Sequence, residues 1–157
     1  DALRLELGLP GMKVLQFGFS DKGAHIHLPH RFTPSTVAYT GTHDNDTTQG
    51  WWGSLGKTEQ KAVETLVGPV SNRPVWPLIR AAVSSVAEVS IVPAQDVLEL
   101  GSEARMNTPA VPAGNWSWRA PEGCWKEDLA TRLADLAGVT DRDNDPLGKP
   151  EEEASGA

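Results

Sequence analysis

The sequence contains a single cysteine, Cys124, among its 157 residues. One cysteine excludes an internal disulfide framework and any zinc site built from cysteines. No stretch approaches the roughly 18 consecutive apolar residues that a membrane-spanning helix needs. The sequence therefore predicts neither a membrane protein nor a small scaffold held together by disulfides.

Positive charge is also scarce, because 14 Lys and Arg stand against 21 Asp and Glu, for a formal net charge of −7. Nucleic-acid-binding surfaces are basic, so this balance argues against a nucleic-acid partner. The length corresponds to a single domain. The first residues lack the charged start, the apolar stretch and the cleavage site of a leader peptide, and we expect a cytoplasmic protein.

The two ends of the chain differ from those of an ordinary domain. The sequence starts without a methionine, inside a predicted helix that stops at Gly8, so we expect a fragment of a longer protein. Residues 141–157 contain six acidic and two basic residues and show no apolar periodicity. We therefore expect a folded segment over residues 1–140 and an acidic, disordered tail over residues 141–157.

Short apolar runs alternate with helical patterns along the folded segment. The runs typical of strands are residues 12–17, 36–39 and 89–92. The helical patterns are residues 58–67, 75–86 and 125–137. This order predicts parallel βα units, in which the functional residues lie in the loops that follow the strands.

The aromatic residues are mostly tryptophan, with six Trp beside one Tyr and three Phe. All of the tryptophans except Trp76 fall in or beside the loops that follow the predicted strands. Flat indole faces stack on the C–H faces of sugar rings, while Asp, Asn, His and Arg side chains bind sugar hydroxyls. The alternative is that these tryptophans anchor long loops to the core.

Three histidines, His25, His27 and His30, form one candidate site. Their spacing could present two imidazoles to a metal ion, but no cysteine lies near them. The pattern favours a structural or sugar-contacting loop, and we expect no metal and no other cofactor.

Two aspartates form the other candidate site, because Asp44 and Asp46 follow the predicted strand at residues 36–39. A carboxylate at the end of such a strand, here beside His43, can meet a substrate at the mouth of a barrel. Glycoside chemistry needs two carboxylates that flank the bond to be cleaved. The same aspartates could instead cap a turn, and the pattern alone leaves both interpretations open.

Four stretches of the chain carry a family resemblance. They are GLPGMKVLQFGF (8–19), LPHRF with TVAYTGTHDNDTTQGWW (28–52), QDVLELGSEARMNTP (95–109) and NWSWR (115–119). In this order and spacing they resemble the C-terminal part of the 4-alpha-glucanotransferases, the amylomaltases or disproportionating enzymes of glycoside hydrolase family 77. The GTHDNDT and EARMNTP segments are the most specific.

The resemblance implies an α/β fold, a (β/α)8 barrel of which this chain supplies the C-terminal part. Its strands six, seven and eight would be residues 12–17, 36–39 and 89–92. The implied activity is the transfer of α-1,4-glucan segments between maltooligosaccharides, with retention of configuration through a covalent glycosyl-enzyme. The implied partners are maltooligosaccharides and α-1,4-glucans, and include neither nucleic acid nor a membrane.

The resemblance also assigns roles to single residues. Asp44 is similar to the family's carboxylate that stabilises the transition state, and His43 beside it binds sugar hydroxyls. Asp21 and Asn107 match sugar-contacting positions, although the usual Asn-Pro a few residues after Asp21 is absent. The nucleophile and the acid/base of the family precede residue 1, so we expect the chain alone to be inactive. The alternative is a non-catalytic sugar-binding or structural module.

Overall fold

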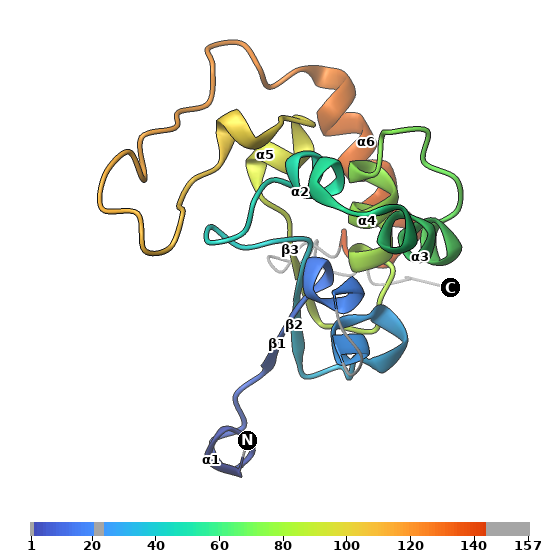
Figure 1. The fold of residues 1–157 in the computed structure, drawn as a ribbon. Coiled ribbons are helices and arrows are strands. Elements are labelled where there is room, and N and C mark those ends of the chain that lie inside the picture. Colours follow the sequence, from blue (N-terminus) through green and yellow to red (C-terminus); the bar gives the residue numbers. More distant parts are fainter. Residues whose placement is uncertain (1, 21–23, 144–157) are drawn as a thin grey trace, which may run out of the picture. The chain divides into compact units, whose positions relative to one another are not determined.

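The computed structural model describes residues 2–20 and 24–143 (Figure 1). The chain divides into two compact units, Asp1–Cys124 and Trp125–Ala157. The expected division into residues 1–140 and 141–157 stays a prediction, and residues 144–157 of the expected tail lie outside the described residues.

A three-stranded parallel sheet in the order β1-β2-β3 forms the centre of the first unit. The strands are β1 (Gly11–Val14), β2 (Thr36–Tyr39) and β3 (Val89–Ile91). The central strand pairs Val37 with Met12 of β1 on one side and with Val89 of β3 on the other. Because the three strands run in the same direction, their carboxyl ends share one edge of the sheet (Figure 1).

One face of this sheet is covered by helix α4 (Val75–Val83), which in turn packs against α3 (Lys57–Val67). The apolar residues of α4 recur at helical spacing, so they fall on one buried face. Ala38 of β2 is fully buried in the core beneath them. The other buried members of this core are Leu15, Phe32, Trp52, Val63, Val70, Leu78, Ala82 and Ala87. Each large aliphatic side chain buried in this way contributes about 1.5–3 kcal/mol.

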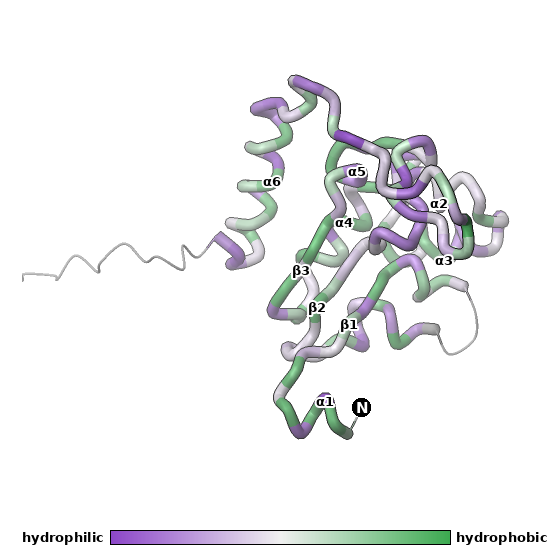
Figure 2. Tube along the Cα trace, turned by 90° about the vertical axis from the view of Figure 1, so that its left-hand side faces the viewer, coloured by the Kyte–Doolittle hydropathy of each residue, from purple (hydrophilic) through white to green (hydrophobic). Residues whose placement is uncertain are grey.

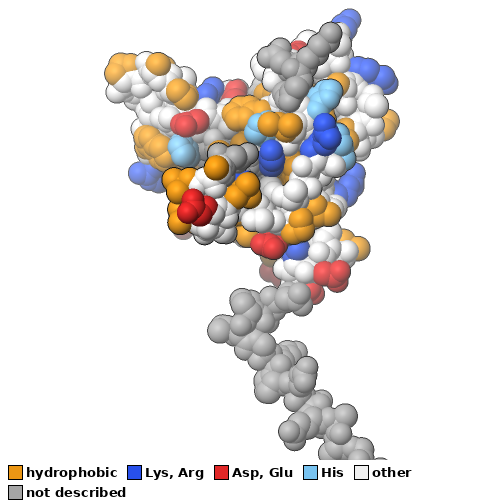
Figure 3. All heavy atoms as spheres, turned by 90° about the horizontal axis from the view of Figure 1, so that it is seen from below, with side chains coloured by type: hydrophobic (Ala, Val, Ile, Leu, Met, Phe, Trp, Pro, Cys, Tyr) orange, Lys and Arg blue, Asp and Glu red, His pale blue; other side chains and the backbone are white. Residues whose placement is uncertain are grey.

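The opposite face of the sheet is partly open within the described part of the chain. Met12, Val89 and Ile91 lie on this face and are 59%, 45% and 44% exposed, whereas Val14 on the same face is fully buried. Helix α1 (Ala2–Glu6) likewise buries none of its residues. Figure 3 looks at the end of the molecule from which α1 projects and shows several exposed apolar side chains there.

The sequence predicted most of these strands and long helices, although several of them begin or end at other residues than expected. The structure confirms a mixed α/β fold with parallel strands, and β2 occupies the expected residues 36–39. The expectation of a strand over residues 12–17 is wrong beyond Val14, because the chain enters the 3-10 helix η1 (Leu15–Phe19). Gly18 of η1 lies so close to the side chain of Leu28 that any side chain at that position would collide with it.

Several short helices occupy segments that the sequence analysis treated as loops. They are η2 (Ala24–His27), η3 (Pro29–Arg31), α2 (Thr48–Ser54), α5 (Ala94–Val97) and η4 (Ser102–Ala104). None of them is long enough to show a clear apolar period, which explains why the pattern missed them.

In the described part of the second unit, residues 125–143, the chain forms helix α6 (Glu127–Val139), close to the expected residues 125–137. Glu127 and Asp128 lie in its first turn, where negative charge is favourable. Polar and apolar residues alternate along it in Figure 2. Within the residues that the structure describes, no helix combines the length and the apolar character needed to cross a membrane.

His27 of η2 generates a prediction about pH. Its Nδ1 accepts the backbone N–H of Val14 at 3.1 Å, and that bond is lost when Nδ1 is protonated. Burial, helped by the positive charge of Lys13, lowers the pKa of His27 below its ordinary value of 6.5. The stabilisation from this histidine is therefore complete above that pH and is lost as the pH falls towards the folded-state pKa.

We expect an NMR titration of the His27 ring to give a midpoint below 6.5. The difference in unfolding temperature between the protein and a His27→Phe variant should narrow as the pH falls from about 7.5 to about 5. A titration midpoint above the ordinary value would contradict the hydrogen bond to Val14.

Candidate functional site

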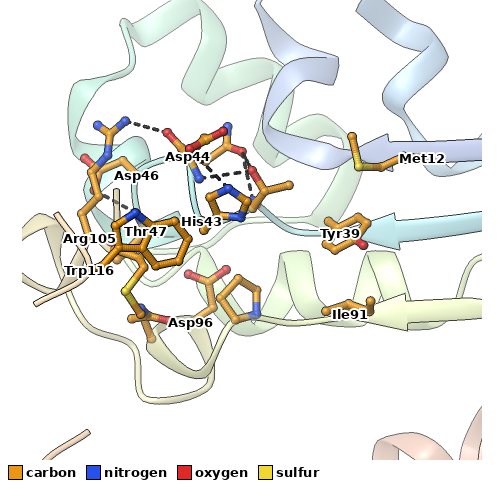
Figure 4. Close-up of a pocket in the computed structure, with 16 residues that line it drawn as sticks. Met12, Tyr39, His43, Asp44, Asp46, Thr47, Ile91, Asp96, Arg105 and Trp116 are labelled. Atoms are coloured by element: carbon orange, nitrogen blue, oxygen red, sulfur yellow. Dashed lines mark hydrogen bonds and ion pairs between the residues drawn. The ribbon is translucent and has the colours of Figure 1, made fainter. Parts of the chain in front are cut away.

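A cavity of about 460 Å³ lies beyond the carboxyl ends of the three strands. Met12, Tyr39 and Ile91, one residue from each strand, line the side nearest the sheet (Figure 4). The rest of its wall comes from residues 41–47 and from a second segment that includes Asp96, Arg105 and Trp116. Ligands of open parallel sheets bind at this edge, so the cavity is the candidate functional site.

The loop after β2 carries the candidate residues on a tight turn. Asn45 Oδ1 accepts hydrogen bonds from the backbone N–H and the hydroxyl of Thr42, at 2.9 and 2.8 Å. The backbone N–H of Asn45 donates to the carbonyl of Thr42 at 3.1 Å. An Asn side chain that bonds its own turn in this way fixes a loop without a sheet or helix. His43 and Asp44 lie at the centre of the turn, with side chains 55% and 51% exposed.

Asp44 is held in place by the segment that follows η4. Asn107 Nδ2 donates to Asp44 Oδ1 at 2.6 Å, and Arg105 Nη2 donates to the Asp44 carbonyl at 2.7 Å. The backbone N–H of Asn107 donates to the carbonyl of His43 at 3.0 Å. The ring atom His43 Nε2 lies 3.4 Å from the same oxygen of Asp44. The structure thus brings together His43, Asp44 and Asn107, three of the four site residues that the sequence suggested.

Trp116 joins this cluster from a loop further along the chain. Its ring centroid lies 5.0 Å from that of His43, with the planes tilted by 40°. Its backbone has a φ of +61°, which is unusual for a tryptophan, and its N–H donates to the carbonyl of Met106 at 2.8 Å. Asn115 secures the loop by bonding the backbone of Thr108 in both directions. The sequence analysis noted Trp116 among the loop tryptophans but did not select it as a site residue.

Asp46 has a different environment from Asp44. Its Oδ1 accepts the N–H of Thr47 at 2.8 Å, and its Oδ2 accepts the hydroxyl of Ser102 at 2.7 Å. Thr47 is the N-cap of α2 and accepts the N–H of Gly50. One carboxylate oxygen of Asp46 therefore bonds the N-cap residue of α2 and the other bonds η4, which is the arrangement expected of a structural, turn-capping aspartate.

A third aspartate, Asp96 of α5, lies at the back of the site and was not selected from the sequence. It is 1% exposed and accepts hydrogen bonds from Thr40 and Thr48. Burial raises the pKa of Asp96 above its ordinary value, although these hydrogen bonds oppose the rise, and the negative charge of Asp46 adds to it. No sequence pattern links Asp96 to Thr40 and Thr48, which lie 56 and 48 residues earlier.

The other candidate residues are Asp21 and the histidines at positions 25, 27 and 30. Asp21 lies outside the described residues, so its proposed contact with sugar stays a prediction. His27 Nδ1 is occupied by the N–H of Val14. Over residues 2–20 and 24–143, no group of three or more His, Cys, Asp or Glu side chains is arranged to hold a metal ion.

An open cavity with a carboxylate, an imidazole and an indole at the carboxyl edge of parallel strands is typical of α/β enzymes that act on polar, ring-shaped substrates. Residues 1–124 match the family model described as 4-alpha-glucanotransferase, glycoside hydrolase family 77, and the chain belongs to that family. The resemblance seen in the sequence is thereby confirmed.

Individual relatives agree with this assignment. The chain is 46% identical over 144 residues to the chloroplastic/amyloplastic 4-alpha-glucanotransferase of Arabidopsis thaliana, covering 89% of this chain and 25% of the relative. It is 42% identical over 150 residues to the 4-alpha-glucanotransferase of Thermus thermophilus, covering 90% and 30%. A solved amylomaltase from Streptococcus agalactiae in complex with acarbose superposes with a TM-score of 0.84 at 32% identity, covering 90% of this chain and 29% of that one.

Two consequences follow from these relatives. The chain spans about a quarter of the length of the curated plant proteins it matches. The expectation of a cytoplasmic protein is wrong, because the plant relatives are described as chloroplastic/amyloplastic. Membership of the family therefore does not fix the compartment.

The start of α2 gives a prediction about stability. A Cβ at Gly50 would collide with the Ser102 hydroxyl and would lie 2.8 Å from both Asp46 carboxylate oxygens. We expect Gly50→Ala to lower the free energy of unfolding by about 1–3 kcal/mol, the usual cost of overpacking. Gly53→Ala in the same helix is the matched control, because a Cβ there meets nothing within 4 Å.

The control should be neutral or should raise the free energy of unfolding by about 0.5–1 kcal/mol, since alanine replaces glycine inside a helix. Denaturant unfolding of the two variants beside the parent protein measures the difference. Equal effects at positions 50 and 53 would show that Ser102 and Asp46 do not pack against α2 as described.

Proposed function

We propose that this chain is the C-terminal part of a retaining 4-alpha-glucanotransferase and supplies its transition-state-stabilising aspartate, Asp44. The whole enzyme would move α-1,4-glucan segments between maltooligosaccharides. The observation that carries the proposal is the cluster of His43, Asp44 and Asn107 at the carboxyl edge of the sheet, with Asp44 and Asn107 joined at 2.6 Å.

The chemistry of this cluster suits a sugar ring. A carboxylate can accept hydrogen bonds from two neighbouring hydroxyls, and Asp44 lines the cavity together with Trp116. His43 adds a ring nitrogen that can bond a hydroxyl, and Asn107 keeps the Asp44 carboxylate in one orientation. The acarbose complex of the solved Streptococcus agalactiae relative supports a carbohydrate ligand for the family.

The contribution of Asp44 would come mainly in the transition state. As the glycosidic bond breaks, the sugar ring flattens and gains positive charge at the anomeric carbon. Hydrogen bonds that Asp44 accepts from the sugar hydroxyls, and that strengthen during this change, lower the barrier, whereas contacts of constant strength only tighten binding.

Two further carboxyl groups complete the proposed reaction. One attacks the anomeric carbon and forms the glycosyl-enzyme, while the other protonates the departing glucan oxygen. That second group then takes the proton from the hydroxyl of the acceptor glucan as the new bond forms. By the family resemblance both groups belong to the part of the enzyme that precedes residue 1. No cofactor, nucleic acid or membrane takes part in this proposal.

The same proposal gives the three strands a place in a larger fold. We propose that β1, β2 and β3 are strands six, seven and eight of a (β/α)8 barrel, within a segment that covers residues 1–140. The exposed face with Met12, Val89 and Ile91 would then point into the barrel, where layers of side chains from the other strands fill the interior. Residues 141–157 would form an acidic tail outside it.

The proposed role of Asp44 can be tested in the full-length enzyme. Asp44→Asn should lower kcat by at least about 100-fold with little change in KM, because it removes a contact made mainly in the transition state. Glu103→Gln serves as the control, since it neutralises an exposed carboxylate on η4 that does not line the cavity. A kcat for Asp44→Asn close to that of the control would favour a turn-capping aspartate.

The isolated 157-residue chain should neither transfer nor hydrolyse maltooligosaccharides. Asp46 cannot replace the missing pair, because both of its oxygens bond Thr47 and Ser102, and it lies two residues from Asp44. Retaining enzymes need two carboxyl groups about 5 Å apart across the bond. The assay is incubation with maltotriose followed by chromatography for glucose and longer glucans.

Sustained turnover that disappears in an Asp44→Ala variant would show that the chain carries its own catalytic set. Binding of maltooligosaccharides without turnover by the full-length protein would favour the alternative, a non-catalytic sugar-binding module.

A further inference from the structure

The carboxyl group of Asp96 is surrounded by hydrogen-bond donors from two other elements. Its Oδ2 accepts the hydroxyls of Thr40 and Thr48, at 2.6 and 2.7 Å, and its Oδ1 accepts the backbone N–H of Thr48 at 2.7 Å. The three side chains are each no more than 1% exposed. Hydrogen bonds to a carboxyl group that water does not reach are stronger and more directional than those at a surface.

These two threonines stand at the two ends of the loop that carries the site. Thr40 is the first residue after β2, and Thr48 is the first residue of α2, so residues 41–47 lie between them. One oxygen atom of Asp96 therefore bonds both ends of the seven-residue loop. In Figure 4 the Asp96 side chain lies below the loop that carries His43 and Asp44. Asp96 therefore holds the two ends of the loop together, and Gln16 supports the same arrangement by donating to the carbonyls of Thr40 and Asp46.

Asp96 also connects the loop to the segment that orients Asp44. The neighbouring Gln95 is buried, and its Nε2 donates to the carbonyl of Ala104 at 3.3 Å, which holds the segment from α5 to η4 together. Arg105 and Asn107 follow directly and bond Asp44. A shift of α5 relative to β2 would therefore move Asn107 relative to the carboxylate it holds.

We propose that Asp96 is a positioning residue for the transferase reaction, which it serves by holding both ends of loop 41–47 in register with the segment that carries Asn107. The inference rests on the proposed function of Asp44. Both carboxyl oxygens of Asp96 are already taken by Thr40 and Thr48, so its influence on the reaction passes through the loop.

The test replaces Asp96 in the full-length enzyme and compares kcat with KM. A misplacement of about 1 Å in a reacting site can cost about 100-fold in rate, so Asp96→Ala should lower kcat by about 10- to 100-fold. KM should change by less than about 3-fold, because contacts made equally in ground and transition states are retained. All rates are measured well below the unfolding temperature of every variant.

A second variant, which weakens the core away from the loop, shows how much kcat falls from general destabilisation alone. Val63 of α3 is fully buried and does not line the cavity, so Val63→Ala weakens the core without touching the loop. Its kcat should stay within about 2-fold of the parent enzyme, since the site geometry is unchanged.

The conservative variant Asp96→Asn should restore most of kcat. Its amide oxygen can still accept the N–H of Thr48, and its NH₂ can donate to the two threonine hydroxyls, which also act as acceptors. Should Asp96→Ala fail to fold, Thr48→Val removes one of the three bonds and should lower kcat by about 3- to 10-fold. Thr65→Val on the exposed side of α3 is its control, because the Thr65 hydroxyl bonds only the carbonyl of Lys61 in its own helix.

The proposal is overturned if Asp96→Ala or Thr48→Val loses no more kcat than its control, or if Asp96→Asn is as slow as Asp96→Ala. The Asp44→Asn variant, measured in the same assay, distinguishes a failure of the proposed function of Asp44 from a failure of the positioning role of Asp96. If Asp44→Asn retains kcat, the proposed function of Asp44 fails, whereas a slow Asp44→Asn beside a fast Asp96→Ala removes only the positioning role.

Discussion

The bonds of Thr40 and Thr48 to the buried carboxyl of Asp96 determine how the chain leaves the sheet. At that point β2 has ended and α2 has not begun, so the backbone and the hydroxyls need partners that neither element supplies. Asp96, from a third element, accepts hydrogen bonds from both threonine hydroxyls and from the N–H of Thr48, and the turn with His43 and Asp44 lies between these two threonines. Asn107 orients the half-exposed carboxylate of Asp44 directly, and the buried contacts of Asp96 support that orientation from below.

Asp44 and Asp46 show how little separates a structural aspartate from a candidate functional one. They are two residues apart in one loop, yet Asp46 bonds Thr47 and Ser102 through its two oxygens while Asp44 is bonded through one oxygen by Asn107. The sequence left both interpretations open for both residues. Both aspartates line the cavity, but the carboxylate of Asp46 joins the start of α2 to η4, whereas Asp44 keeps an oxygen without such a structural bond among the described residues.

Local sequence predicted the elements whose signals are local. The strand at residues 36–39 has β-formers between Pro34 and Gly41, and α4 shows its apolar stripe directly. The end of β1 was missed because Leu15–Phe19 has the composition of a strand, while Gly18 against Leu28 decides its course. Helix α2 was missed because Gly50 and Gly53 are poor helix formers. The family motifs identified Asp44, His43 and Asn107, but Asp96 gained its partners through contacts about 50 residues apart, which no periodicity records.

The separation along the chain between paired strand residues indicates the order in which the sheet can assemble. Pairing Gly11 with Thr36 closes a loop of 25 residues, and pairing Val37 with Val89 closes one of 52. Each doubling of loop length costs only about 0.6 kcal/mol of closure entropy, so length alone barely favours one pairing over the other. The larger difference is that α3 and α4 lie within the longer loop and can bring β3 to β2 by packing together first. Packing of α3 against α4, rather than the shorter chain separation between β1 and β2, would then bring together the edge of the sheet that carries the site.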